Sequence, residues 1–143
     1  MIVYAESSAV LAWLLGEPSG TGARRILAGA ERVVASTLTA VECARGLARA
    51  RALRRLTTVD EMAALRLLDA AEATWDVLDL SDRVLARARG RFSEEPVRTL
   101  DALHLGTAAL FHEALGGVTL LSYDERVRSN AAGLGLAVAP TRL

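Results

Sequence analysis

The chain has 143 residues, of which 52% are hydrophobic and 24% are charged, and its formal net charge is zero. This length and composition predict one folded domain spanning residues 1–143 and exclude a disordered chain. No apolar run approaches the ~20 residues needed to cross a bilayer, and no basic segment precedes the first apolar run, as a secretory signal requires. The single cysteine, Cys43, excludes an internal disulfide framework, so we expect a cytoplasmic protein with no membrane partner and Cys43 buried in its core.

All seventeen basic side chains are arginines, and this excludes several phosphate-handling classes. A Walker-type phosphate loop needs a lysine, as do phosphotransfer folds that place a lysine beside the phosphoryl group. Five arginines cluster within eleven residues, at Arg45, Arg49, Arg51, Arg54 and Arg55. They form either a solvated helix face or a docking surface for an RNA backbone or an acidic partner.

Short β-type runs alternate with longer helical segments along the chain. Strands are expected at residues 2–5, 32–36, 75–80 and 118–122, with a possible fifth within 134–140. Helices are expected after Ser7 and Ser8, at 21–28, from Thr39 toward residue 55, at 57–72 with Thr58 as cap, at 81–89, at 100–115 with Thr99 as cap, and at 124–133. This alternation predicts an α/β fold in which helices cover both faces of a parallel sheet of four to five strands.

Four acidic residues lie where the chain is expected to pass from a strand to a helix: Glu6, Glu42, Asp101 and Asp124. In an open parallel sheet, the carboxyl ends of the strands open into one crevice, so these side chains are expected to meet there. Crowded carboxylates resist ionising together unless a cation or a proton lies among them. The cation that suits such oxygen ligands is a hard divalent metal such as Mg²⁺ or Mn²⁺.

Each acid also has a structural explanation. Thr39 and Glu42 have the spacing of a capping box, and the other three acids lie at helix starts, where the helix dipole favours negative charge. His104 lies three residues after Asp101 and is expected to be packed or hydrogen-bonded on an apolar helix, with a ligand or proton-transfer role as the alternative.

At these residues the chain resembles the PIN-domain ribonucleases, in particular the toxin component of VapBC-type toxin–antitoxin pairs. The segment IVYAESSAVLAWLLGEPSG resembles the family's first strand, first acid and following helix. TLTAVECARGLAR is similar to the region of the second acid, and RTLDALHLGTAAL to that of the third. LLSYDERVRSNAAGLGLAV resembles the fourth acid and the last strand, so the resemblance runs nearly end to end.

The resemblance implies a PIN-like three-layer α/β/α sandwich and a Mg²⁺-dependent endoribonuclease toxin, with Mn²⁺ as the possible alternative ion. It implies catalytic roles for Glu6, Glu42, Asp101 and Asp124, with Glu6, Asp101 and Asp124 around the metal. Ser8 is expected to hydrogen-bond a carboxylate or the substrate phosphate, or to cap a helix. Arg98 is expected to contact a phosphate, or to form a surface ion pair. The implied partners are an RNA substrate, a cognate antitoxin and a second copy of the chain in a homodimer.

One residue departs from the family pattern. The first acid is usually aspartate, whereas this chain has Glu6. Glutamate keeps the charge but extends the carboxylate by one methylene, and Mg²⁺ demands near-ideal octahedral geometry. The alternative function is therefore a PIN-like module that binds RNA or a protein with weak or no cleavage.

Overall fold

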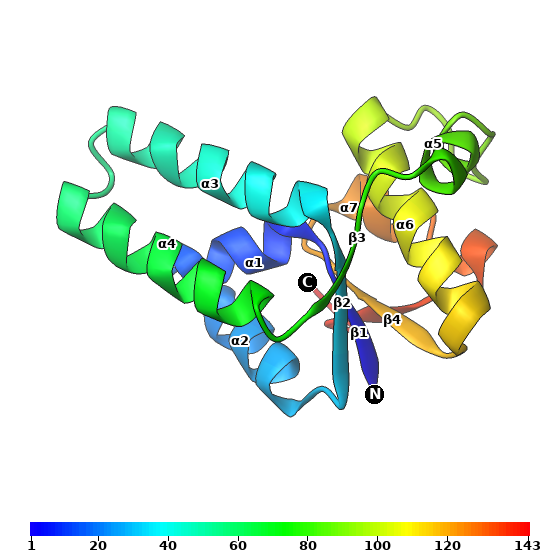
Figure 1. Ribbon diagram of the computed structural model, residues 1–143, viewed down its shortest axis with the longest axis horizontal. Coiled ribbons are helices and arrows are strands. Elements are labelled where there is room, and N and C mark those ends of the chain that lie inside the picture. Colours follow the sequence, from blue (N-terminus) through cyan, green and yellow to red (C-terminus); the bar gives the residue numbers. More distant parts are fainter.

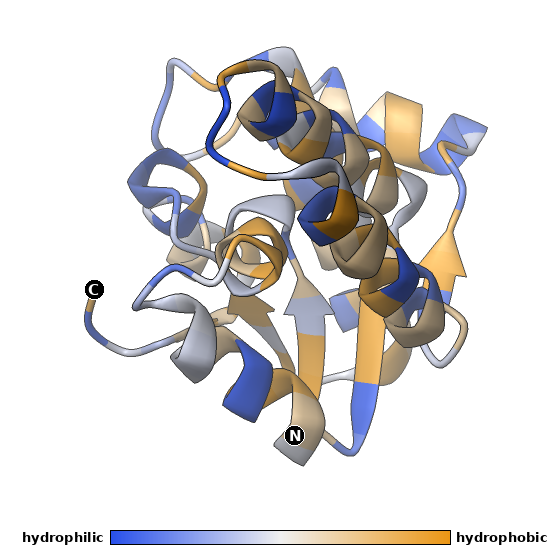
Figure 2. Ribbon diagram, turned by 90° about the vertical axis from the view of Figure 1, so that its left-hand side faces the viewer, coloured by the Kyte–Doolittle hydropathy of each residue, from blue (hydrophilic) through white to orange (hydrophobic).

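Five parallel strands form one sheet in the computed structural model, which describes residues 1–143. They are β1 (Ile2–Ala5), β2 (Arg32–Ser36), β3 (Asp76–Leu78), β4 (Val118–Leu121) and β5 (Ala137–Ala139). Their spatial order is β3-β2-β1-β4-β5. In the central register, Val3 pairs with Val33 on β2 and with Thr119 on β4. The strands carry mostly hydrophobic residues (Figure 2), as expected for a sheet covered on both faces.

Helices cover both faces of this sheet (Figure 1). They are α1 (Ser7–Leu14), α2 (Gly20–Gly29), α3 (Thr37–Ala52), α4 (Thr58–Glu72), α5 (Asp82–Ala88), α6 (Thr99–Leu115) and α7 (Glu125–Arg128), with a 3₁₀ turn at Ala132–Leu134. The order of the strands explains the two layers. From β1 to β3 the chain moves toward one edge of the sheet, and from β3 to β5 it moves back past β1 toward the other. Since such crossovers are right-handed, α1–α4 lie on one face and α5–α7 on the opposite face. The three-layer α/β/α prediction is confirmed.

The alternation of side chains along the strands divides the core between these faces. Tyr4 packs with Leu105 of α6, whereas its neighbour Ala5 packs with Leu47 of α3. All four residues are fully buried. Burying a leucine side chain contributes about 1.5–3 kcal/mol, so each helical layer is held to the sheet by its apolar face. No helix combines the length and the apolar character needed to span a bilayer.

Most expected elements are present, but three expected helix caps are wrong. Helix α3 begins at Thr37 with Ser36 as its cap, rather than at Thr39. Helix α4 is capped by Thr57 in a capping box with Asp60, rather than by Thr58. Thr99 is the first residue of α6 and is not its cap. In each case the helix begins one or two residues earlier than expected, so a preceding residue takes the cap position.

The other differences are smaller. Strand β3 covers only Asp76–Leu78 of the expected 75–80, and the last expected helix is divided into α7 and the 3₁₀ turn. Cys43 is fully buried, as expected.

Candidate active site

A pocket of about 490 Å³ opens at the carboxyl end of the sheet. Strands β1 and β4 are neighbours here, but the helices that follow them lie on opposite faces, which is the place where open α/β sheets form a crevice. The pocket is lined by Glu6, Ser7, Ser8, Leu11, Glu42, Arg98, Thr99, Leu100, Asp101 and Asp124. The structure therefore brings all six predicted site residues together, although they come from four distant parts of the chain.

Glu6 follows β1 directly and caps α1, accepting a hydrogen bond from the Ser8 amide at 3.1 Å. Its Oε2 also accepts from the hydroxyls of Ser8 and Ser122, the latter at 2.7 Å, and its Oε1 accepts from Ser7 Oγ at 2.8 Å. The residue is only 4% exposed. A buried carboxylate is costly without such partners. Glu6 therefore caps the helix, as the structural alternative expected, and also lines the pocket.

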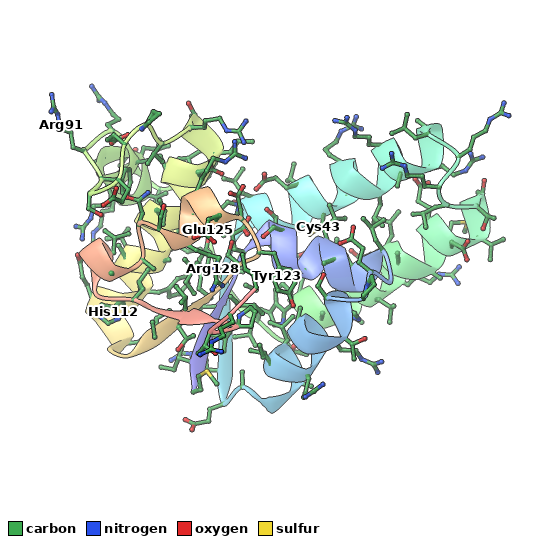
Figure 3. The ribbon with its side chains drawn as sticks, turned by 180° about the vertical axis from the view of Figure 1, so that it is seen from behind. Cys43, Arg91, His112, Tyr123, Glu125 and Arg128 are labelled. Atoms are coloured by element: carbon green, nitrogen blue, oxygen red, sulfur yellow. The ribbon has the colours of Figure 1, made fainter.

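The same serines tie the end of β1 to the segment that follows β4. Ser8 Oγ accepts from the Tyr123 amide at 2.8 Å, and Ser122 Oγ accepts from the Asp124 amide at 3.1 Å. Arg128 holds this segment from the other side by donating to the carbonyl oxygen of Ser122 at 2.9 Å. Figure 3 shows Tyr123 and Arg128 close together in this region. The backbone beside Asp124 is thus fixed relative to Glu6.

Asp124 caps the short helix α7. Its Oδ1 accepts from the Arg126 amide at 2.9 Å, and the Arg126 guanidinium contacts both carboxylate oxygens, at 3.3 and 3.2 Å. Partial burial raises the pKa of Asp124, but the hydrogen bonds and charge of Arg126 bring that pKa below its ordinary value. Asp124 is therefore ionised at neutral pH and has an arginine as its counterion.

Asp101 differs because one of its oxygens has no partner. It lies in the first turn of α6, and its Oδ2 is buried without a hydrogen bond. The nearest cation is Arg98, whose Nε lies 3.8 Å from that oxygen. Burial raises the pKa of Asp101, and the negative charge of Asp124 raises it further. A buried carboxylate oxygen without a partner is a position that a cation would stabilise.

Glu42 lies in the second turn of α3, where a capping role is impossible. The expected capping box is wrong: the hydroxyl of Thr39 donates to the carbonyl oxygen of Ala5 at 2.9 Å, and Ser36 caps the helix. Glu42 Oε1 instead contacts Nε2 of His104 and accepts from Ser7 Oγ at 3.1 Å. Burial raises the pKa of Glu42, but the hydrogen bonds from His104 and Ser7 bring it below its ordinary value.

Three residues that contact these acids were not predicted as site residues. Ser7 bridges Glu6 and Glu42, Ser122 binds Glu6, and His104 binds Glu42. Both serines were visible in the sequence, but Ser7 was interpreted as part of a helix start and Ser122 as the end of the fourth strand. The contact of His104 joins residues 62 positions apart, and no local pattern indicates it.

The acidic side chains that line the pocket offer carboxylate oxygens, the ligand type that hard divalent cations prefer. One of these oxygens, Asp101 Oδ2, has no hydrogen-bond partner in the protein. However, no group of three or more His, Cys, Asp or Glu side chains is arranged to hold a metal ion. The contacts explain why: serines hold Glu6, and Arg126 holds Asp124. A cation at this site would have to compete with Arg126 for Asp124.

Comparisons with known proteins show the family and support the fold. The PIN domain family matches residues 3–133 of the chain. Ribonuclease VapC46 of Mycobacterium tuberculosis is 37% identical over 136 residues, covering 95% of each chain. The solved structure of PAE2754 from Pyrobaculum aerophilum superposes with a TM-score of 0.60 at 23% identity, covering 96% of this chain and 81% of the other. The structure of FitAB bound to a DNA fragment gives a TM-score of 0.69 at 17% identity, covering 100% and 97%. These two structures support the fold.

Proposed function

The chain belongs to the PIN-domain family, and from this premise we propose that it is a metal-dependent endoribonuclease toxin that hydrolyses RNA phosphodiester bonds. The observation that carries the proposal is the gathering of Glu6, Glu42, Asp101 and Asp124 in one pocket at the carboxyl end of the sheet. The 37% identity to a ribonuclease over 95% of both chains supports the same reaction class. The unpartnered buried oxygen of Asp101 supports the requirement for a cation.

We assign the metal to Glu6, Asp101 and Asp124. When bound, Mg²⁺ or Mn²⁺ supplies positive charge against the phosphate oxygens and makes water a better nucleophile. Arg98 is 66% exposed at the pocket, so its guanidinium can bind a phosphate of the RNA backbone. Ser8 holds Glu6 in place and lines the same wall of the pocket.

Glu42 orients the attacking water in this proposal. Its pKa lies below the ordinary value, so the carboxylate is ionised at neutral pH and accepts a hydrogen bond. Both of the hydrogen bonds that its carboxylate accepts from the protein, from His104 and Ser7, are at Oε1. Oε2 is therefore available to a water molecule in the pocket, and Glu42 can receive a proton from it.

A cleavage assay tests this function. Purified protein, free of any antitoxin, is incubated with total RNA in Mg²⁺, in Mn²⁺ or in a chelator. We expect metal-dependent cleavage that Asp101→Asn abolishes and that Asp79→Asn, an exposed acid outside the pocket, leaves intact. RNA binding without cleavage in either metal would instead support the PIN-like binding module.

We also propose that a cognate antitoxin inhibits the enzyme by docking along α3. A groove of about 890 Å³ is lined there mainly by apolar residues and reaches Glu42. Val41 and Leu53 in this groove are more than half exposed. The test is coexpression with the product of a neighbouring short reading frame: Val41→Glu should weaken inhibition and leave cleavage unchanged. Inhibition as strong as that of the unmodified chain would contradict this docking site.

The family also suggests a homodimer. Sedimentation equilibrium should therefore give twice the chain mass of 15.2 kDa, and a mass of one chain would contradict the dimer.

A further inference from the structure

A chain of contacts runs from the core to the pocket. Tyr4 Oη lies 2.8 Å from Nδ1 of His104, and Nε2 of the same ring contacts Oε1 of Glu42. The two rings are edge-on, with centroids 6.0 Å apart and an interplanar angle of 79°. Tyr4 is 0% exposed and His104 is 1% exposed. These residues come from β1, α6 and α3, so the contacts cross from one helical layer through the sheet to the other.

We propose that Tyr4 and His104 are positioning residues, which set the imidazole tautomer and thereby hold Glu42 in the orientation that cleavage needs. The proposal rests on the proposed ribonuclease function. Neither residue lines the pocket, so neither touches the substrate. Their effect reaches the reaction through Glu42, because a ring whose tautomer and orientation are fixed from behind is a better partner for a catalytic group.

The hydrogen-bonding capacity of each atom decides the tautomer. An ionised carboxylate oxygen only accepts hydrogen bonds, so the nitrogen that faces Glu42 must carry a proton. If the hydroxyl of Tyr4 donates to Nδ1, a neutral ring with its proton on Nε2 satisfies both contacts. The phenol hydroxyl of Tyr4 carries its own proton and lies 2.8 Å from Nδ1, so it can act as the donor in this contact.

The two carboxylate oxygens of Glu42 therefore differ in their hydrogen bonding. Oε1 of Glu42 contacts His104 and Ser7, while Oε2 accepts no hydrogen bond from the protein. Ser7 Oγ also lies 2.8 Å from Oε1 of Glu6, so its single proton is shared between the two carboxylates and couples the orientation of Glu42 to the first acid of the pocket. Without a proton on Nε2, the lone pair of the ring would face Glu42 and repel it.

Three single variants and one double variant test the proposal through cleavage. Tyr4→Phe keeps the ring and removes only the hydroxyl, and we expect kcat to fall about tenfold with KM changed by less than about twofold. His104→Gln places an amide donor near the position of Nε2 and should keep most of the activity. His104→Asn places its amide donor near the position of Nδ1, away from Glu42, and should lose most of the cleavage activity. Adding Tyr4→Phe to His104→Gln should have no further effect, because an amide donor does not depend on the tyrosine.

Tyr123→Phe is the matched control, since it removes the other phenol hydroxyl of the chain, which donates to the carbonyl oxygen of Ser19. It should leave kcat unchanged. Melting temperatures of all variants separate loss of fold from loss of rate. Equal loss of kcat in His104→Gln and His104→Asn, or wild-type kcat in Tyr4→Phe, would overturn the proposal.

A second measurement does not depend on cleavage. The chain has only two histidines, so a long-range ¹H–¹⁵N spectrum with His112→Gln for assignment isolates His104. We expect the wild type to show a proton on Nε2, and Tyr4→Phe to show a mixture of tautomers. A wild-type proton on Nδ1 alone would overturn the proposal even if the enzyme cleaves RNA. Absence of cleavage by the wild type in both metals would instead overturn the proposed function, whatever the spectrum shows.

Discussion

Asp101→Asn should stabilise the protein in the absence of metal although it abolishes cleavage. The Asp101 side chain is only 15% exposed, and its Oδ2 is buried without a hydrogen bond. An unsatisfied buried polar group costs about 1–3 kcal/mol, and more when it is charged. Asparagine has the same shape without the charge but still leaves a polar atom at this position. We therefore expect the free energy of unfolding to rise by about 1 kcal/mol. That gain raises the melting temperature by about 2–4 °C for a chain near this size.

The pH dependence of this gain follows from the raised pKa of Asp101. Burial and Asp124 raise that pKa in the folded state, so the native protein binds the proton more tightly than the unfolded chain. The stability contribution of protonated Asp101 is complete below about pH 3.9, the ordinary aspartate value, and is lost as pH rises through the folded pKa. The advantage of Asp101→Asn should therefore be small near pH 4 and complete at neutral pH.

Thermal unfolding with and without metal completes the test. A ligand that binds only the folded state at 100 times its Kd stabilises it by about 2.7 kcal/mol. Mn²⁺ should therefore raise the melting temperature of the wild type and leave that of Asp101→Asn nearly unchanged. A lower melting temperature for the variant in chelator, or an equal response to Mn²⁺, would refute the assignment of Asp101 as an unpartnered metal ligand.

Three further predictions concern separate parts of the molecule. Glu42→Gln should reduce cleavage at least tenfold. Because the folded pKa of Glu42 is lowered, any loss of melting temperature in this variant should be present at neutral pH and should shrink as the pH falls below about 4. Arg98→Ala should weaken RNA binding by a similar factor for all RNA sequences. In filter-binding titrations it should reduce the slope of log binding constant against log salt concentration by about one, and an unchanged slope would exclude a phosphate contact. Gly20→Ala should cost about 1–3 kcal/mol in urea unfolding, because its Cβ would lie 2.3 Å from the Ala12 carbonyl oxygen, whereas the control Gly29→Ala meets nothing within 4 Å.

The fold could be predicted because its determinants are local. Alternating hydrophobic runs and helical stripes identified all five strands, and β1 and β2 match their expected limits. The wrong caps lie where several hydroxyl residues are neighbours. In STLT, Ser36, Thr37 and Thr39 can each cap a helix, and only the end of β2 decides that Ser36 does.

The site could be predicted only in part, because only some of its determinants are local in the sequence. Acids next to strand ends can be found from the chain, so the gathering of Glu6 and Asp124 was foreseeable. Glu42 is different, because it lies a full turn inside α3 and its place in the pocket depends on His104 and Ser7. Such contacts between distant elements follow from packing, which a local pattern does not contain.

The structure also bears on whether Glu6 marks a weakened enzyme. Three serine hydroxyls and one amide bind the Glu6 carboxylate, and both of its oxygens are engaged. Aspartate is one methylene shorter, so Glu6→Asp would withdraw the carboxylate from Ser122, which holds the segment before Asp124. A hydrogen bond to a charged group contributes about 1.5–3 kcal/mol. If the site is adapted to glutamate, Glu6→Asp should therefore lower kcat by about tenfold or more, and Ser122→Ala should lower it in the same direction. A gain of cleavage in Glu6→Asp would show the reverse: the serines would then hold the longer side chain away from its productive position, and the weakly cleaving binding module would be the better account of this chain.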